Sequence, residues 1–319
     1  MIEIKNIDIL KNHTDLPETL LLRNYNEILM SAGRDGKVNL WNTESQEVFF
    51  SWLPYNGIEL HHADFSIDMR FLLVHFGMYN EARVIEMESR RVFDVPLLTD
   101  YCCSPCFAPN NSIVSYIHNF VYHIDICNHQ GIKVLFKADS RILSLTWFYS
   151  RKYFVLLTRK GVVSVVDASS GHPVVVIPQK YLNPDFIYIS QDDLLVIIGY
   201  KKSNCIDIWR VDFNESCVKT ELINSFTEMK SLFRDKYGDC RYGYINFMSS
   251  DTTFVCGVIT PLTYVDCSTH EAQEIQVHDK KVGYIECIAI DVSKKKIIIP
   301  LGGDNMPGTI GVITYEQLR

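Results

Sequence analysis

The chain has 319 residues, 47% of them hydrophobic, and a net charge of −7 at pH 7. This composition is typical of a globular chain that can bury a core, and the acidic balance argues against direct nucleic-acid binding, which needs a surplus of Lys and Arg. No stretch approaches 18 uncharged apolar residues, and residues 1–5 do not resemble a signal peptide, so neither membrane insertion nor secretion is expected. We therefore expect a cytoplasmic or nuclear protein.

The first predicted element is a strand over residues 2–10, where apolar and polar side chains largely alternate. A polar quartet follows, with spacings of 18, 4 and 6 residues: His13, Ser31, Asp35 and Trp41. The run that begins at Ser31 reads S-A-G-R-D-G-K-V-N-L-W-N. It resembles a repeat of the WD40 family, in which a His, a Ser, an Asp and a Trp form a buried hydrogen-bonded tetrad within one blade. The resemblance implies that the carboxylate accepts from the imidazole, and that the hydroxyl links the imidazole to the indole N–H. Such a network is favourable only when every member is satisfied.

The strand that ends at Trp41-Asn42 has counterparts along the whole chain. Successive copies are 39 to 56 residues apart, and the first residue of each pair is Ile, Val or Trp, as expected of a position facing the core. The other copies are Ile85-Glu86, Ile124-Asp125, Val166-Asp167, Trp209-Arg210, Val265-Asp266 and Ile313-Thr314. A period of this length is typical of propeller blades.

Each copy holds three or four short β-rich runs bounded by turn residues; in the fourth copy these runs are 142–147, 153–158, 161–167 and 173–177. The sequence thus predicts an all-β fold, a seven-bladed β-propeller of four-stranded antiparallel blades, forming a single domain over residues 1–319. The complete tetrad occurs in the first copy only, so the resemblance covers the chain by its period and is specific in one or two blades.

The last copy lacks a fourth strand, because after runs at 284–290, 296–300 and 309–314 the sequence ends at Arg319. An open blade would leave an unpaired edge. The simplest solution is that residues 2–10 close the last blade as its outer strand. Such an overlap of the two ends is also what the WD40 resemblance implies.

Residues 224–241 lengthen the period between the fifth and sixth copies. Ser225 and Glu228 have the spacing of a capping box, and aromatic residues then recur at helical spacing. We interpret the segment as an inserted amphipathic helix, with an irregular loop as the alternative. Because aromatic residues and Arg dominate binding energy at interfaces, the partner-binding candidates lie here. They are Phe226, Met229, Phe233, Arg234, Tyr237 and Arg241.

No motif indicates catalysis, a cofactor or a metal. The densest Cys cluster, at residues 102–106, lacks the second pair of ligands that a zinc site needs, and His61 and His62 would face opposite sides of a strand. The run at residues 294–296 is interpreted as a solvated turn. Asp125, Asp167 and Asp266 occupy equivalent blade positions and are interpreted as structural residues at strand ends.

The sequence therefore predicts a non-catalytic platform for protein–protein interactions. The expected role is that of a scaffold subunit in a larger intracellular, eukaryotic-type complex, with proteins or peptides as partners. Two alternatives stay open: a propeller enzyme or small-ligand binder that uses a central channel, and a lipid-binding propeller. Direct binding to nucleic acid or to a membrane is not expected.

Overall fold

The structure is a computed structural model. It describes residues 2–23, 27–54, 58–76, 81–95, 103–126, 132–181, 183–190, 193–200, 205–214, 218–227, 244–247, 253–257, 262–266, 271–275, 287–301 and 308–317. The regular elements in these ranges are all β-strands. The chain divides into two compact units. The first comprises Met1–Ala63, Phe76–Tyr79 and Ser231–Arg319, and the second comprises Asp64–His75 and Asn80–Lys230.

The first unit contains the strands from both ends of the chain. They are β1 (Ile2–Lys11), β2 (Pro17–Arg23), β3 (Ile28–Gly33), β4 (Val38–Asn42), β5 (Val48–Trp52), β22 (Tyr244–Phe247), β23 (Thr253–Gly257), β24 (Leu262–Asp266), β25 (Glu271–Ile275), β26 (Ala289–Asp291), β27 (Lys296–Pro300) and β28 (Thr309–Gln317). They pair in the orders β2-β3-β4-β5, β22-β23-β24-β25 and β1-β28-β27-β26.

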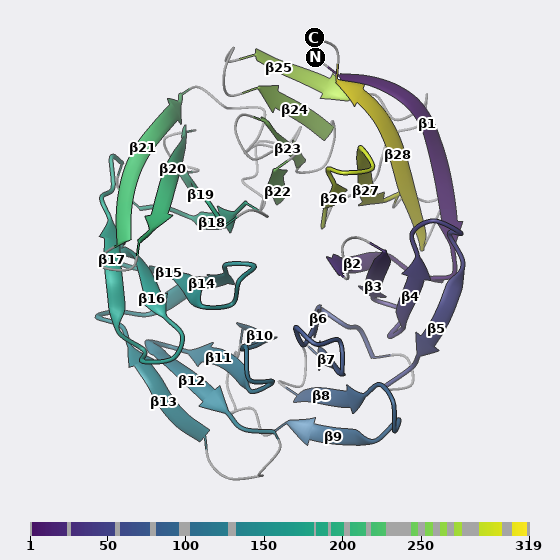
Figure 1. Cartoon of the computed structure of the whole chain (residues 1–319), viewed down its shortest axis with the longest axis horizontal. Helices are drawn as coiled ribbons and strands as arrows, with labels where there is room; N and C mark the ends of the chain where they lie inside the picture. The colour runs from purple at the N-terminus through teal and green to yellow at the C-terminus, as the bar shows by residue number, and fades with distance from the viewer. Residues whose placement is uncertain are drawn as a thin grey trace. The chain divides into compact units, whose positions relative to one another are not determined.

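The second unit contains half of β6, most of β7 and all of the strands from β8 to β21. They are β6 (His62–Phe65), β7 (Phe71–Phe76), β8 (Glu81–Glu86), β9 (Val92–Val95), β10 (Cys103–Phe107), β11 (Ile113–Ile117), β12 (Phe120–Ile124), β13 (Ile132–Lys137), β14 (Ile142–Trp147), β15 (Tyr153–Thr158), β16 (Val163–Asp167), β17 (Pro173–Ile177), β18 (Phe186–Ile189), β19 (Leu195–Tyr200), β20 (Cys205–Phe213) and β21 (Val218–Phe226). Each successive group of four forms one antiparallel sheet, which Figure 1 shows strand by strand.

The predicted number of blades is corrected from seven to six. Six sheets are described with side chains as well as backbone, and these are the four-stranded blades that the structure establishes. The strands β22–β25 pair as a backbone ladder, but Tyr264 is the one residue among them whose side chain is described. The structure therefore describes six complete four-stranded blades, one fewer than the period of the sequence predicts.

Position within a sheet explains the composition of each strand. The second strand of a blade is covered on both faces, so every residue of β7 and of β19 is buried and their sequences are almost continuously apolar. The last strand is covered on one side, and exposed residues therefore recur in β5 and β17. The predicted runs at 142–147, 153–158 and 173–177 coincide with β14, β15 and β17, because each is bounded by turn residues.

The strand β1 pairs antiparallel with β28, from Ile2 opposite Gln317 to Lys11 opposite Thr309. A register shift between Ile4 and Asn6 places Ile4 and Ile7 on the same face of β1, and Leu10 lies on the opposite face by the ordinary alternation of a strand. Ile4 and Ile7 pack against the cluster that contains Ile290 and Ile313, whereas Leu10 packs with Leu20, Leu22 and Leu29 of the β2–β5 blade. The N-terminal strand thus joins the last blade to the β2–β5 blade.

The hairpin turn between the third and fourth strands of a blade follows one local rule. In the β2–β5 blade the Asn42 side chain accepts from the backbone N–H groups of Glu44 and Ser45. In the β14–β17 blade the Asp167 carboxylate accepts in the same way from Ser169 and Ser170. The second residue of the repeated pair is therefore a turn cap, which is why Asn and Asp recur there.

The predicted helix over residues 224–241 is wrong at its start. Ser225, expected to cap the helix, lies in β21 opposite Asp207, and Phe226 lies opposite Ile206. The backbone hydrogen bonds of β20 extend β21 through Phe226, and this pairing outweighs the local capping-box pattern. Residues 228–241 lie outside the described residues.

Candidate functional site

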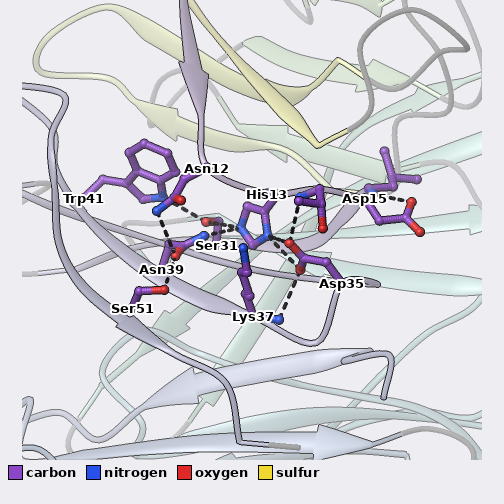
Figure 2. Close-up of polar contacts among 11 residues, drawn as sticks. Asn12, His13, Asp15, Ser31, Asp35, Lys37, Asn39, Trp41 and Ser51 are labelled. Carbon is purple, nitrogen blue, oxygen red and sulfur yellow. Dashed lines mark hydrogen bonds and ion pairs between the residues drawn. The ribbon is translucent and has the colours of Figure 1, made fainter. Parts of the chain in front are cut away.

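The structure brings His13, Ser31, Asp35 and Trp41 together in the β2–β5 blade (Figure 2). His13 lies in the segment before β2, Ser31 on β3, Asp35 in the β3–β4 turn and Trp41 on β4. Adjacent strands place these residues side by side although the chain separates the first from the last by 28 positions.

The distances form a continuous chain of hydrogen bonds. His13 Nδ1 lies 3.0 Å and 3.1 Å from the two carboxylate oxygens of Asp35. His13 Nε2 lies 2.7 Å from Ser31 Oγ, which accepts from Trp41 Nε1 at 2.8 Å. An imidazole with its proton on Nδ1 satisfies all four groups, because Nδ1–H then donates to the carboxylate and the hydroxyl donates to Nε2.

Asn39 is a fifth member that the sequence analysis missed. Its Nδ2 lies 3.0 Å from His13 Nε2, and its Oδ1 accepts from Ser51 Oγ at 2.8 Å and from Asn12 Nδ2 at 3.2 Å (Figure 2). The signal available in the sequence was a polar Asn between Val38 and Leu40, in a strand that was expected to face the core. We call these five residues, the tetrad and Asn39, the His13 network.

The charge state of Asp35 is set by its partners. Its side chain is almost fully buried. Burial would raise the pKa of this carboxyl, but the hydrogen bond and charge of His13, with the N–H groups of Thr14 and Lys37, lower it below its usual value. Asp35 is therefore a carboxylate that fixes both the imidazole and the β3–β4 turn.

A second buried polar group connects three blades, and the sequence analysis did not find it. Arg151, in the β14–β15 turn, places its Nη2 2.9 Å and 3.1 Å from the carboxylate oxygens of Asp64 on β6. Its Nη1 donates to the carbonyl of Phe107 on β10, whose N–H donates to Asp64 at 2.9 Å. We call these three residues the Asp64 cluster. It lies within the second unit.

The Asp64 cluster is almost fully removed from solvent, with Arg151 7% and Asp64 3% exposed. Burial works against the charge of the guanidinium, but the Asp64 carboxylate and the neighbouring Cys106 thiol raise the pKa of Arg151 above its usual value. The guanidinium also lies over the Trp147 ring, with Cζ 5.7 Å from the ring centre. Arg151 has a positive φ of 57°, which the β14–β15 turn imposes. No local spacing in the sequence indicates a pair that is 87 residues apart.

The β18–β21 blade shows the same architecture without the network. Trp209 lies opposite Val196, as Trp41 lies opposite Leu29, but Ile198 occupies the position that Ser31 has in the β2–β5 blade. Within the described part of the chain, the buried indole N–H of Trp209 has no hydrogen-bond partner. The Trp is therefore retained for its packing, in a cluster with Val165 and Tyr200.

The partner-binding candidates are not assembled into a described site. Phe226 is 5% exposed at the end of β21, where it lies opposite Ile206. Met229, Phe233, Arg234, Tyr237 and Arg241 lie outside the described residues. The basic run begins in the turn between β26 and β27, where Lys294 and Lys295 are exposed as predicted, and Lys294 and Lys296 also donate to Thr43 of the β2–β5 blade.

His61 contacts an acidic side chain of the β2–β5 blade. Its Nδ1 lies 2.8 Å from Glu18 Oε2, and Arg34 Nε lies 2.6 Å from Glu18 Oε1. Among the residues that the structure describes, no group of three His, Cys, Asp or Glu side chains could hold a metal ion. Across the same residues, no helix is long and apolar enough to cross a membrane.

No protein-family profile matches this sequence, and no curated protein matches it. The structure is similar to the crystal structure of the Myceliophteria thermophila Cps50 (Swd1) beta-propeller domain, with a TM-score of 0.75. The two chains share 11% sequence identity, and the similarity covers 98% of this chain and 99% of that one. The chain has the fold of a WD40-type β-propeller. At this level of identity the likeness concerns the fold alone, and the WD40-type propeller agrees with the His13 network in the β2–β5 blade.

Proposed function

We propose that this WD40-type propeller is a non-catalytic platform for protein–protein interactions, and a scaffold subunit of a larger intracellular complex in the cytoplasm or nucleus. The observation that carries the proposal is the way buried polar groups hold exposed turns. The Asp35 carboxylate fixes the β3–β4 turn by accepting from the Lys37 N–H. Arg34 and His61 are more than a third exposed, and both contact Glu18, whose side chain is almost buried. A turn with a fixed backbone and exposed side chains can present those side chains to a protein partner in one defined arrangement.

The single-domain organisation over residues 1–319 and the contact role of Met229, Phe233, Arg234, Tyr237 and Arg241 are part of this proposal. β21 ends at Phe226, so a deletion that tests the segment should begin after that residue. Replacing residues 228–241 with a Gly/Ser linker is expected to weaken partner retention without changing the circular dichroism of the β-sheets.

The direct test is purification of the tagged full chain from its own cells, followed by size-exclusion chromatography and quantitative mass spectrometry. A platform is expected to elute in a complex with at least one stoichiometric protein partner that is retained on repeated chromatography. Elution as a lone chain that carries a stoichiometric metal or turns over a substrate would contradict the proposal and favour a propeller enzyme.

A further inference from the structure

The charges of the chain are strongly segregated. Residues 131–184 contain eight Lys or Arg and two Asp or Glu, a net charge of +6 in a chain whose total is −7. The rest of the chain therefore carries −13. This basic stretch comprises β13 and the whole β14–β17 blade. A strongly acidic chain that concentrates its positive charge in one place has a surface that attracts the opposite sign.

Four of these cations lie in neighbouring turns at one end of the β14–β17 blade. We call them the basic edge: Lys137, Arg141, Arg159 and Lys160. Backbone bonds hold them together, since Arg159 N–H donates to the Arg141 carbonyl at 2.7 Å and Lys160 N–H donates to Ser140 Oγ at 3.3 Å. Lys137 ends β13, and the N–H of the next residue, Ala138, donates to the Asn119 carbonyl at 2.7 Å.

The basic edge is exposed and largely unneutralised. All four of its side chains are exposed. Among the described residues, Asp139 forms an ion pair with this edge, 3.6 Å from Lys160, and both members of that pair are at least half exposed. An exposed pair of this kind contributes little and exchanges readily with other charges.

From this geometry we infer that the basic edge docks an acidic peptide segment of a protein partner. The inference rests on the proposed function, because it names the chemistry of one partner of the platform. The backbone that carries the cations is already hydrogen-bonded, so little ordering entropy opposes binding. Leu143 lies on β14, two residues after Arg141, and is 45% exposed. It adds an apolar contact next to the charges.

The same observations favour a peptide over nucleic acid. A nucleic acid is a long polyanion. The residues outside 131–184 carry a net charge of −13, which would repel it. A short segment that mixes carboxylates with apolar residues matches both the compact cluster and Leu143. Charge complementarity of this kind mainly sets partner choice and association rate.

The test uses fluorescence anisotropy with a short labelled peptide of alternating Glu and Leu, and its Gln/Leu counterpart, at low and at physiological salt. The full chain is expected to bind the Glu peptide, to bind it less tightly as salt rises, and to ignore the Gln peptide. Reversing three charges together (Arg141→Glu, Arg159→Glu and Lys160→Glu) is expected to weaken binding by about tenfold or more.

A matched control reverses three exposed cations elsewhere: Arg91→Glu, Lys152→Glu and Lys219→Glu. It makes the same change in net charge and is expected to alter affinity by less than about twofold. Equal losses in both variants, or an unchanged affinity in the edge variant, would overturn the inference. If the triple variant does not fold, the neutral pair Arg141→Gln with Arg159→Gln gives the same reading with a smaller loss of about threefold.

Three further outcomes separate this inference from others. Tighter binding of a labelled single-stranded oligonucleotide than of the Glu peptide, through the same residues, would overturn it in favour of nucleic acid. In the purification experiment, a stoichiometric partner retained equally by the wild type and the edge variant would leave the platform standing and overturn the basic edge as its contact. A wild-type chain without any partner would contradict the platform, while the peptide titration would still report on the edge.

Discussion

The His13 network and the Asp64 cluster are both buried polar groups, but they connect the chain over different distances. The His13 network lies within one blade, and its members are at most 28 residues apart in sequence, from His13 to Trp41. The Asp64 cluster joins β6, β10 and the β14–β15 turn, and its ion pair spans 87 residues. The first group fixes the shape of a blade and its turn, and the second fixes three blades to one another.

The two groups also differ in what their loss should cost. The His13 network shares its hydrogen bonds among neutral groups and one carboxylate, so losing a member leaves a few orphaned groups. The Asp64 cluster contains a buried guanidinium, and a buried charge without its partner is far more costly than a neutral orphan. The long-range group is therefore expected to be the more sensitive to single substitutions.

The largest effect is expected from removing another long-range connection, the pairing of β1 with β28. Deleting residues 1–10 removes Ile4, Ile7 and Leu10 from two hydrophobic clusters and exposes the edge of β28. We expect aggregation or loss of a single cooperative unfolding transition, measured by light scattering and calorimetry. A monomeric truncated chain that unfolds cooperatively would show that β1 is dispensable.

The next effect concerns the Asp64 cluster. Asp64→Ala leaves the Arg151 guanidinium and the Phe107 N–H without their buried acceptor, and it should lower the free energy of unfolding by about 3–5 kcal/mol. Chemical denaturation at pH 7 measures this loss. The double variant Asp64→Leu with Arg151→Met removes both charges and should recover part of it, and a double variant as unstable as both single losses added together would contradict a coupled pair.

A smaller loss is expected within the His13 network. Asp35→Ala orphans the imidazole and the N–H groups of Thr14 and Lys37, and it should cost about 1–3 kcal/mol. Because the pKa of Asp35 is lowered in the folded state, its contribution is complete above the usual value of 3.8 and is lost as the pH falls below it. The difference in stability between wild type and variant should therefore shrink on acidification, and a difference that grows towards low pH would show that the carboxylate is not the stabilising form.

The smallest effect comes from a matched pair of Trp residues. Trp41→Phe removes the donor to Ser31 Oγ and should cost about 1 kcal/mol beyond the loss of packing. Trp209→Phe removes an indole N–H that has no partner among the described residues, so the packing loss should be its whole cost. Equal losses in the two variants, measured by thermal unfolding, would show that the hydrogen bond of Trp41 contributes nothing.

The same contrast explains what the sequence could predict. The strands and turns follow from local patterns, because a strand such as β15 is one apolar run between turn residues, and Asn42 and Asp167 cap their turns through the next few residues. The four members of the tetrad are equally local, since adjacent strands bring short spacings together. Residue spacing within one blade was therefore sufficient to predict these strands, these turns and the tetrad.

The remaining features depend on contacts between distant segments. The Asp64 cluster has no fixed spacing, because the packing of three blades decides which Arg meets which Asp. Ser225 and Glu228 form a valid capping pattern, yet pairing with β20 draws Ser225 and Phe226 into a strand. The remaining predicted blade corresponds to β22–β25, of which the structure describes the backbone pairing and one side chain, that of Tyr264.

The His13 network stabilises a single blade, whereas the Asp64 cluster connects three. Hydrogen–deuterium exchange of two variants tests this difference most directly. Asp35→Ala should speed amide exchange in β2–β5 and leave β6, β10 and β14 unchanged. Arg151→Met should speed exchange in β6, β10 and β14 together, although the substitution lies in one turn. Exchange that rises only around residue 151 in this second variant would contradict the account.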